Sequence, residues 1–194
     1  MNDSSAQSDA GNRRQPTVVA LTGFMGCGKS AVGRNLAELL GWSFVDLDEE
    51  IERREGLAIR EIFARRGETA FREVEHQALT ELLATGRTNV VLALGGGTYA
   101  QARNEALLRH ASVWTIFIDV PLATLLRRCC SAQDPEQSRP LAADAEKFKQ
   151  LYEARMPSYR QAEMIFEADE RPAMENARAI AAKLALIREN DAGA

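Results

Sequence analysis

The stretch GFMGCGKS, residues 23–30, has residue types and a spacing that suit phosphate chemistry. The residues that fit the pattern G-x-x-x-x-G-K-[ST] are Gly23, Gly28, Lys29 and Ser30. Glycines let successive backbone N–H groups turn towards a phosphate, and the start of a following helix adds its positive end. Lys29 can then reach the β- and γ-phosphates, while the Ser30 hydroxyl can ligate Mg²⁺. The stretch predicts a nucleoside triphosphate site, with an ordinary glycine-rich turn as the weaker alternative.

Two carboxylates follow at the end of a second apolar run. Asp46 and Asp48 stand two residues apart, and side chains at i and i+2 of a strand leave the same face. One carboxylate could lie near Mg²⁺ and the other could hold a hydroxyl acceptor. The alternative is an acidic start to the helical pattern DEEIERR, where carboxylates only favour the helix N-terminus. These two residues alone do not choose between the alternatives.

An arginine with a neighbouring glutamate suggests a site for an acidic acceptor. Arg72 and Glu75 are three apart in GETAFREVE, residues 67–75, and are therefore neighbours on a predicted helix. An arginine braced by a glutamate is a rigid planar donor for a carboxylate ligand. A surface ion pair is the alternative, and on this helix alone it is the more common case.

Three consecutive glycines end a third predicted strand, within LGGGTY, residues 94–99. A tight turn needs one or two glycines, so a run of three predicts close approach to this backbone. We expect a ligand to make that approach.

Secondary-structure elements must bring these residues together, and the sequence predicts alternating strands and helices. The predicted strands cover residues 17–22, 42–48, 89–96, 113–119 and 163–168. The predicted helices cover residues 31–40, 49–66, 68–83, 101–109, 122–130, 145–155 and 172–188. Strands that are apolar throughout, with helices between them, indicate an α/β fold with a parallel sheet covered on both faces. In such a sheet the carboxyl ends of the strands form the ligand crevice.

Composition limits the classes of function. A chain of 194 residues that is 45% hydrophobic can bury one core, and we expect a disordered tail over 1–15 and a single domain over 16–190. A formal charge of −4 provides no general basic field for nucleic acid. No apolar run approaches the roughly 20 residues that span a bilayer, and residues 1–15 lack the apolar centre of a signal peptide. Three cysteines without a CxxC pair are typical of a reducing compartment and imply no zinc.

These limits favour a cytoplasmic monomer with small-molecule substrates and with neither nucleic acid nor a membrane as partner.

One segment does not fit the pattern of alternating strands and helices. Residues 131–145 are polar, contain two prolines and are longer than an ordinary connection. They are a candidate mobile lid.

The motifs occur in the order and at the spacing of the shikimate kinases, a family that the chain resembles from Thr17 to the final helix. The matching stretches are GFMGCGKSAVGRNLAELLG, FVDLDEEIE, IFARRGETAFREVE, LALGGGT, SRPL and YEARMPSY. The resemblance implies a P-loop NTPase-type three-layer α/β/α fold, with a five-stranded parallel sheet and a mobile lid. It also implies transfer of the γ-phosphate of ATP to the 3-hydroxyl of shikimate, in aromatic amino-acid biosynthesis.

The resemblance implies a set of site residues as well. Those implied for ATP are Gly26, Cys27, Gly28, Lys29, Ser30, Ala31, Arg128 and Arg139. Those implied for shikimate are Asp48, Arg72, Gly95, Gly96, Gly97 and Arg155. Mg²⁺, the implied cofactor, would be bound by Ser30 and Asp46, and the implied catalytic residues are Lys29, Asp48 and Arg139.

Within that set, Asp48 would accept the proton of the shikimate hydroxyl, and Arg139 would bring a cation on the lid to the transferring phosphate. Arg155 is assigned by the resemblance alone. Two alternatives stay open: a kinase of another polyol acid such as gluconate, and a nucleotide switch that uses ATP without a small acceptor.

Overall fold

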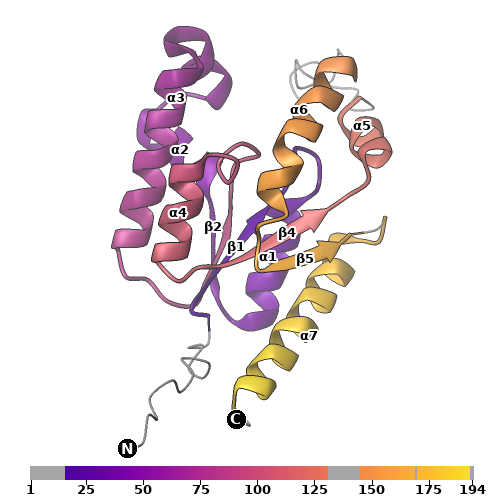
Figure 1. Ribbon diagram of the computed structural model, residues 1–194. Helices are drawn as coiled ribbons and strands as arrows, with labels where there is room; N and C mark the ends of the chain where they lie inside the picture. Colours follow the sequence, from indigo (N-terminus) through magenta and orange to yellow (C-terminus); the bar gives the residue numbers. More distant parts are fainter. Residues whose placement is uncertain (1–15, 131–144, 169, 193–194) are drawn as a thin grey trace, which may run out of the picture.

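The structure is a computed structural model that describes residues 16–130, 145–168 and 170–192. Five strands form one parallel sheet in the order β2-β3-β1-β4-β5 (Figure 1). The strands are β1 (Val18–Thr22), β2 (Ser43–Asp46), β3 (Val90–Ala93), β4 (Trp114–Asp119) and β5 (Met164–Glu167). The helices are α1 (Lys29–Leu40), α2 (Leu47–Glu55), α3 (Ile59–Ala84), α4 (Ala102–His110), α5 (Leu122–Cys130), α6 (Ala145–Tyr159) and α7 (Ala173–Ala192). The predicted α/β class and the five-stranded parallel sheet are confirmed.

The order of the strands determines which loops meet. β3 lies between β1 and β2, although it follows both of them in the chain. Leu21 of β1 and Asp46 of β2 are both aligned with Ala93 of β3. The three loops that follow these strands therefore start side by side at the carboxyl edge of the sheet, where ligands bind in open α/β folds.

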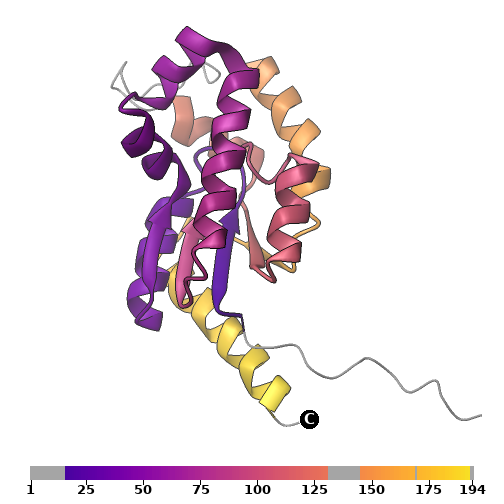
Figure 2. The same cartoon turned by 90° about the vertical axis from the view of Figure 1, so that its left-hand side faces the viewer.

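Helices cover both faces of this sheet. α1 and α7 pack side by side on one face, and α3 and α4 lie together on the other (Figures 1 and 2). The middles of the central strands are consequently buried, with Val19–Leu21 of β1 and Ile116–Ile118 of β4 at most 1% exposed. Burial on both faces explains why these strands are apolar throughout, without the alternation of a half-exposed sheet.

One predicted helix is wrong and one predicted break is confirmed. The pattern over 49–66 is two helices, because Gly56 adopts a left-handed conformation (φ 64°) and its N–H donates to the carbonyl of Glu52, which ends α2. α3 begins three residues later, at Ile59. Gly67 is non-helical (φ 79°, ψ 174°) and kinks α3 at the position where the sequence predicted a break.

Some predictions concern residues that the structure does not describe. The predicted tail, 1–15, lies outside the described residues, and so do Arg139 and all of the predicted lid except Ala145, which begins α6. Across the described ranges, no helix combines the length and the apolar character that crossing a membrane requires.

Candidate active site

Residues 23–30 form a loop between β1 and α1, and we call this segment the P-loop. Gly23, Gly26 and Gly28 have φ values of 144°, 80° and 93°, a region that glycine enters without steric cost. The N–H of Val32 donates to the carbonyl of Gly28 (2.9 Å), so the helix starts directly after the loop. Backbone N–H groups and the positive end of α1 are thereby directed at one point, which suits a phosphate.

Two cations lie against the P-loop. Lys29 Nζ donates to the carbonyls of Gly23 (2.9 Å) and Phe24 (3.2 Å). Arg128 of α5 donates to the carbonyl of Gly26 through Nη1 (3.3 Å), which places it beside the P-loop. Both cations are therefore close to the loop that would hold a polyphosphate.

Two further positions assigned to ATP, one in the P-loop and one directly after it, differ in exposure. The side chain of Cys27 is buried (3% exposed) and lies 3.7 Å from Lys29 Nζ. Ala31, in the first turn of α1, is exposed. Cys27 thus fills space beneath the loop, whereas Ala31 lies at its surface.

The hydroxyl of Ser30 and the carboxylate of Asp46 come together at the edge of the P-loop. Ser30 Oγ donates to Asp46 Oδ2 (2.5 Å), and the other oxygen of this carboxylate accepts the N–H of Asp48 (3.0 Å). A hydroxyl and a carboxylate are hard oxygen ligands that suit Mg²⁺, which takes few protein ligands besides substrate phosphates. In the described part of the chain no three His, Cys, Asp or Glu side chains gather into a cation cage. The hydroxyl of Ser30 and the carboxylate of Asp46 fit a metal that is shared with a nucleotide.

The two aspartates do not leave the same face of one strand, and that prediction is wrong. β2 ends at Asp46, which caps α2, and Asp48 lies in the first turn of this helix. Asp46 is directed at Ser30, whereas a Cβ placed on Gly95 would lie 2.7 Å from Oδ1 of Asp48. The chain turns from strand to helix between the two residues, and this turn separates their carboxylates.

Arg72 lies between two glutamates of its own helix. Its Nη1 contacts Glu75 Oε2 (3.0 Å) and its Nη2 contacts Glu68 Oε1 (3.1 Å). The side chain of Glu75 is only 1% exposed, so the Arg72–Glu75 pair is a buried brace and not a surface ion pair. Burial lowers the pKa of Arg72, but the charges and hydrogen bonds of Glu75 and Glu68 outweigh it, and the net pKa lies above the ordinary value. Arg72 therefore stays a cation.

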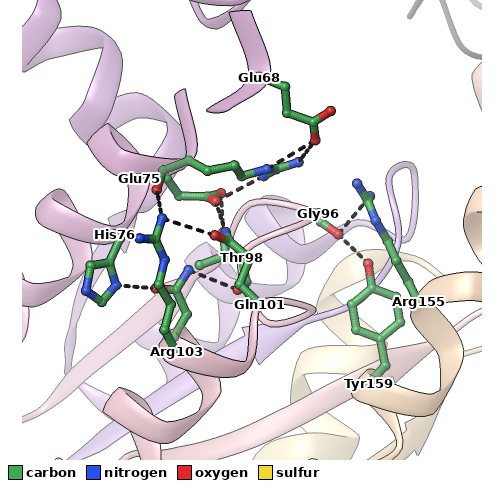
Figure 3. A network of polar contacts seen from close by, with 11 residues as sticks. Glu68, Glu75, His76, Gly96, Thr98, Gln101, Arg103, Arg155 and Tyr159 are labelled. Atoms are coloured by element: carbon green, nitrogen blue, oxygen red, sulfur yellow. Dashed lines mark hydrogen bonds and ion pairs between the residues drawn. The ribbon is translucent and has the colours of Figure 1, made fainter. Parts of the chain in front are cut away.

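The three glycines after β3 lie against the side chains of other site residues. A Cβ on Gly97 would lie 2.7 Å from both Nη atoms of Arg72, and a Cβ on Gly95 would meet Asp48. The carbonyl of Gly96 accepts hydrogen bonds from Arg155 Nη1 (3.0 Å) and from the hydroxyl of Tyr159 (Figure 3). Close approach to this backbone is confirmed, but the groups that approach are side chains of the chain itself.

Arg155, which only the resemblance had assigned, lies at the meeting point of α6, the P-loop and the glycines. Its guanidinium carbon is 5.6 Å from the centre of the Phe24 ring, and it shares the carbonyl of Gly96 with Tyr159. Burial raises the pKa of the Tyr159 phenol well above its usual range, so this hydroxyl remains a donor at every working pH. A Cβ on Gly96 would lie 3.6 Å from the backbone nitrogen of Met25, which places the P-loop beside the Gly95–Gly97 turn.

Sequence reasoning missed three residues of this arrangement. Tyr159 follows Arg155 by four positions in YEARMPSY, and this helical spacing was a usable signal that both side chains point the same way. Thr98 and Gln101, which donate hydrogen bonds to Glu75, gave no comparable signal because their partner on α3 is 23 and 26 residues away in the chain.

A phosphate cradle at the end of β1 lies beside a glycine turn at the end of the neighbouring strand β3, and this turn is lined by a carboxylate and two arginines. This arrangement defines the class of a P-loop kinase with a small acceptor. A family model described as shikimate kinase matches residues 25–185. The chain belongs to the shikimate kinase family.

Individual relatives agree with this membership. A shikimate kinase of Thermus thermophilus is 40% identical over 172 residues, which cover 88% of this chain and 91% of the relative. One of Persephonella marina is 40% identical over 147 residues, covering 75% of this chain and 85% of the relative. Among solved structures, shikimate kinase from Acinetobacter baumannii in complex with shikimate is 37% identical, with a TM-score of 0.79 over 90% of this chain and 94% of that one.

Proposed function

We propose that this chain transfers the γ-phosphate of ATP to the 3-hydroxyl of shikimate, giving shikimate 3-phosphate and ADP on the route to aromatic amino acids. The observation that carries the proposal is the gathering of Asp48, Arg72 and Arg155 around the Gly95–Gly97 turn, beside the P-loop. A carboxylate and two arginines on one glycine turn match an acceptor that has both hydroxyls and an acid group. The solved relative from Acinetobacter baumannii is a complex with shikimate.

On the acceptor side, Arg72 and Arg155 bind the carboxylate of shikimate. Asp48 binds the hydroxyl that attacks and accepts its proton, a role that suits a carboxylate beside an unhindered backbone. Gly95, Gly96 and Gly97 contact the ring hydroxyls through their backbone groups. The absence of side chains there lets the acceptor lie close to the P-loop.

On the nucleotide side, the P-loop residues from Gly26 to Ser30 and the adjoining Ala31 bind the phosphates together with Arg128. Lys29 compensates the charge that develops on the transferring group, which is the main contribution a protein makes to phosphoryl transfer. Ser30 and Asp46 would hold Mg²⁺, which would supply positive charge against the phosphates of ATP. Arg139 is assigned to the transferring phosphate and lies outside the described residues.

A coupled assay of ADP release tests the proposal against its alternatives. Release that depends on shikimate supports it, and release that depends on gluconate favours a kinase of another polyol acid. ADP release that no acceptor stimulates would favour a nucleotide switch. Mg²⁺ is tested in the same assay by chelation and by replacement with other divalent ions.

We also infer the domain organisation, the cellular compartment and the oligomeric state of the chain. A single catalytic domain over residues 16–190 is supported by the one continuous sheet on which the described helices pack. We place the chain in the cytoplasm as a monomer, in line with its buried thiols Cys27 and Cys129. Light scattering in solution tests the monomer.

Arg72→Lys is expected to raise the KM for shikimate on the order of tenfold, because an ammonium group cannot make the paired planar contact with a carboxylate. The KM for ATP should change little. Steady-state kinetics with each substrate varied in turn measures both constants. Arg65→Lys, on the same helix in an exposed pair with Glu61, is the matched control and should behave like the wild type. A loss of ATP binding in Arg72→Lys would instead place this residue on the nucleotide side.

Gly97→Ala is expected to fold normally and to weaken shikimate binding, with a KM on the order of tenfold higher. The added Cβ would lie 2.7 Å from the guanidinium of Arg72, whose flexible end can move aside but then loses its geometry. Gly86→Ala is the control, because that glycine has a positive φ (65°) and a Cβ added there would meet no described atom within 4 Å. The control should lose some thermal stability and keep its KM. An unchanged KM in Gly97→Ala would show that the position of Arg72 is not critical.

A further inference from the structure

The carboxylate of Glu75 is buried and accepts hydrogen bonds from three side chains, one on its own helix and two on another segment. Oε2 accepts from Arg72 Nη1 (3.0 Å) and from Gln101 Nε2 (2.5 Å), and Oε1 accepts from the hydroxyl of Thr98 (2.6 Å). A buried carboxylate keeps a fixed orientation only when its oxygens have such partners. Two of the three donors come from the segment directly after the triple glycine (Figure 3).

Both of these donors are themselves held in place. The carbonyl of Thr98 accepts from Asn104 Nδ2 (3.1 Å), and Asn104 Oδ1 contacts Nδ1 of His76 (2.6 Å). The Gln101 amide oxygen accepts from Arg103 Nη2 (3.4 Å), which fixes the amide so that its nitrogen faces Glu75.

Arg103 also ties the arginine of the acceptor site to this segment. The same Nη2 atom donates to the backbone carbonyl of Arg72 (2.8 Å), and Nη1 contacts Glu73 (2.7 Å). The start of α4 is thereby connected to Arg72 in two ways. Arg103 bonds the backbone carbonyl of Arg72, and Gln101 is linked to the Arg72 side chain through Glu75. The position of the guanidinium thus depends on residues that do not contact it directly.

We propose that Thr98 and Gln101 are positioning residues for binding the acid group of the substrate, because they fix Glu75 and Glu75 fixes the guanidinium of Arg72. The inference rests on the proposed function, in which Arg72 binds the carboxylate of shikimate. Loss of the Thr98 hydroxyl removes the donor to Oε1 of Glu75, and loss of the Gln101 amide leaves Oε2 with Arg72 alone. In either case the carboxylate can rotate, and Arg72 loses its preset orientation. The affinity for the carboxylate of the substrate then falls, whereas the KM for ATP does not change.

Calorimetric titration with shikimate and with its methyl ester, which lacks the carboxylate charge, tests this inference. Thr98→Val and Gln101→Leu, which keep side-chain volume and remove the donor, are expected to raise the Kd for shikimate about 5- to 30-fold. The Kd for the ester and the KM for ATP should stay within about twofold of the wild type. Thr98→Ser, which keeps the hydroxyl, should restore binding of the acid.

A double-mutant cycle shows whether the effect passes through Arg72. In an Arg72→Ala background, Thr98→Val should cause little further loss of shikimate affinity, because the group that it positions is already gone. A full additional loss in that background would overturn the inference. Thr80→Val and Gln77→Leu, on the exposed side of α3, remove matched donors that bond within the same helix and should leave both Kd values unchanged.

The outcomes separate this inference from the proposed function. Wild-type protein that binds no shikimate would overturn the proposed function and this inference with it. Wild-type protein that binds shikimate, with unchanged Kd values in both variants, would overturn only the positioning role. If Thr98→Val does not fold, Gln101→Leu carries the same test, since Gln101 is only partly buried. A lower thermal stability with normal shikimate binding would show that these residues are merely structural.

Discussion

Lys29→Ala is expected to fold like the wild type and to lose at least roughly 10²-fold in the rate of phosphoryl transfer. The side chain reaches back over the P-loop, with Nζ 2.9 Å from the carbonyl of Gly23, where it can meet the transferring phosphate. Without it, the negative charge that develops on that group has no compensating cation at this position. The rate is measured by coupled ADP release at saturating ATP and shikimate, with thermal unfolding as the check on the fold.

Two further variants make the Lys29 result specific. Lys29→Met keeps most of the side-chain volume without the charge, so it should lose activity as Lys29→Ala does. Lys149→Ala removes an exposed lysine of α6 that pairs with Glu153, and it should keep full activity. Retention of more than about a tenth of the wild-type rate in both Lys29 variants would contradict a direct role in transfer.

Asp48→Asn is expected to bind ATP normally and to lose about 10²- to 10⁴-fold in turnover, the contribution of a positioned base. Its carboxylate faces Gly95 on the acceptor side, so added metal should not restore the rate. Asp46→Asn should behave differently. Its carboxylate accepts from Ser30, so this variant should use the metal–nucleotide complex poorly and be partly rescued by excess Mg²⁺.

The measurement is a pair of metal titrations of the rate at saturating ATP and shikimate. Glu49→Gln is the matched control, because Glu49 lies one residue after Asp48 but pairs with Arg34 at the surface. It should follow the wild-type titration. Identical rescue curves for the two aspartate variants would mean that both carboxylates do one job, and the separation of metal and acceptor roles would be wrong.

The sequence by itself determined the P-loop and the class of fold. Gly23, Gly28, Lys29 and Ser30 are close together in the chain, so their spacing alone predicts a loop between a strand and a helix. The apolar strands with helices between them likewise predict a covered parallel sheet. The contact between Arg72 and Glu75 was predictable for the same reason, because residues three apart on a helix are neighbours. All of these features depend on local geometry.

Only the tertiary structure decided how the local motifs combine. The placement of β3 between β1 and β2 brings the triple glycine beside the P-loop and Asp48, and no spacing along the chain encodes that order of strands. The end of β2 at Asp46 sends the two aspartates to different partners.

The sequence also could not predict that the Arg72–Glu75 pair is buried. A glutamate three residues from an arginine can be a surface pair or a buried brace, and the packing of α4 against α3 decides which. The donors Thr98 and Gln101 are 23 and 26 residues from Glu75 in the chain. Contacts over such separations depend on how whole elements pack, so they become visible only when the chain is folded.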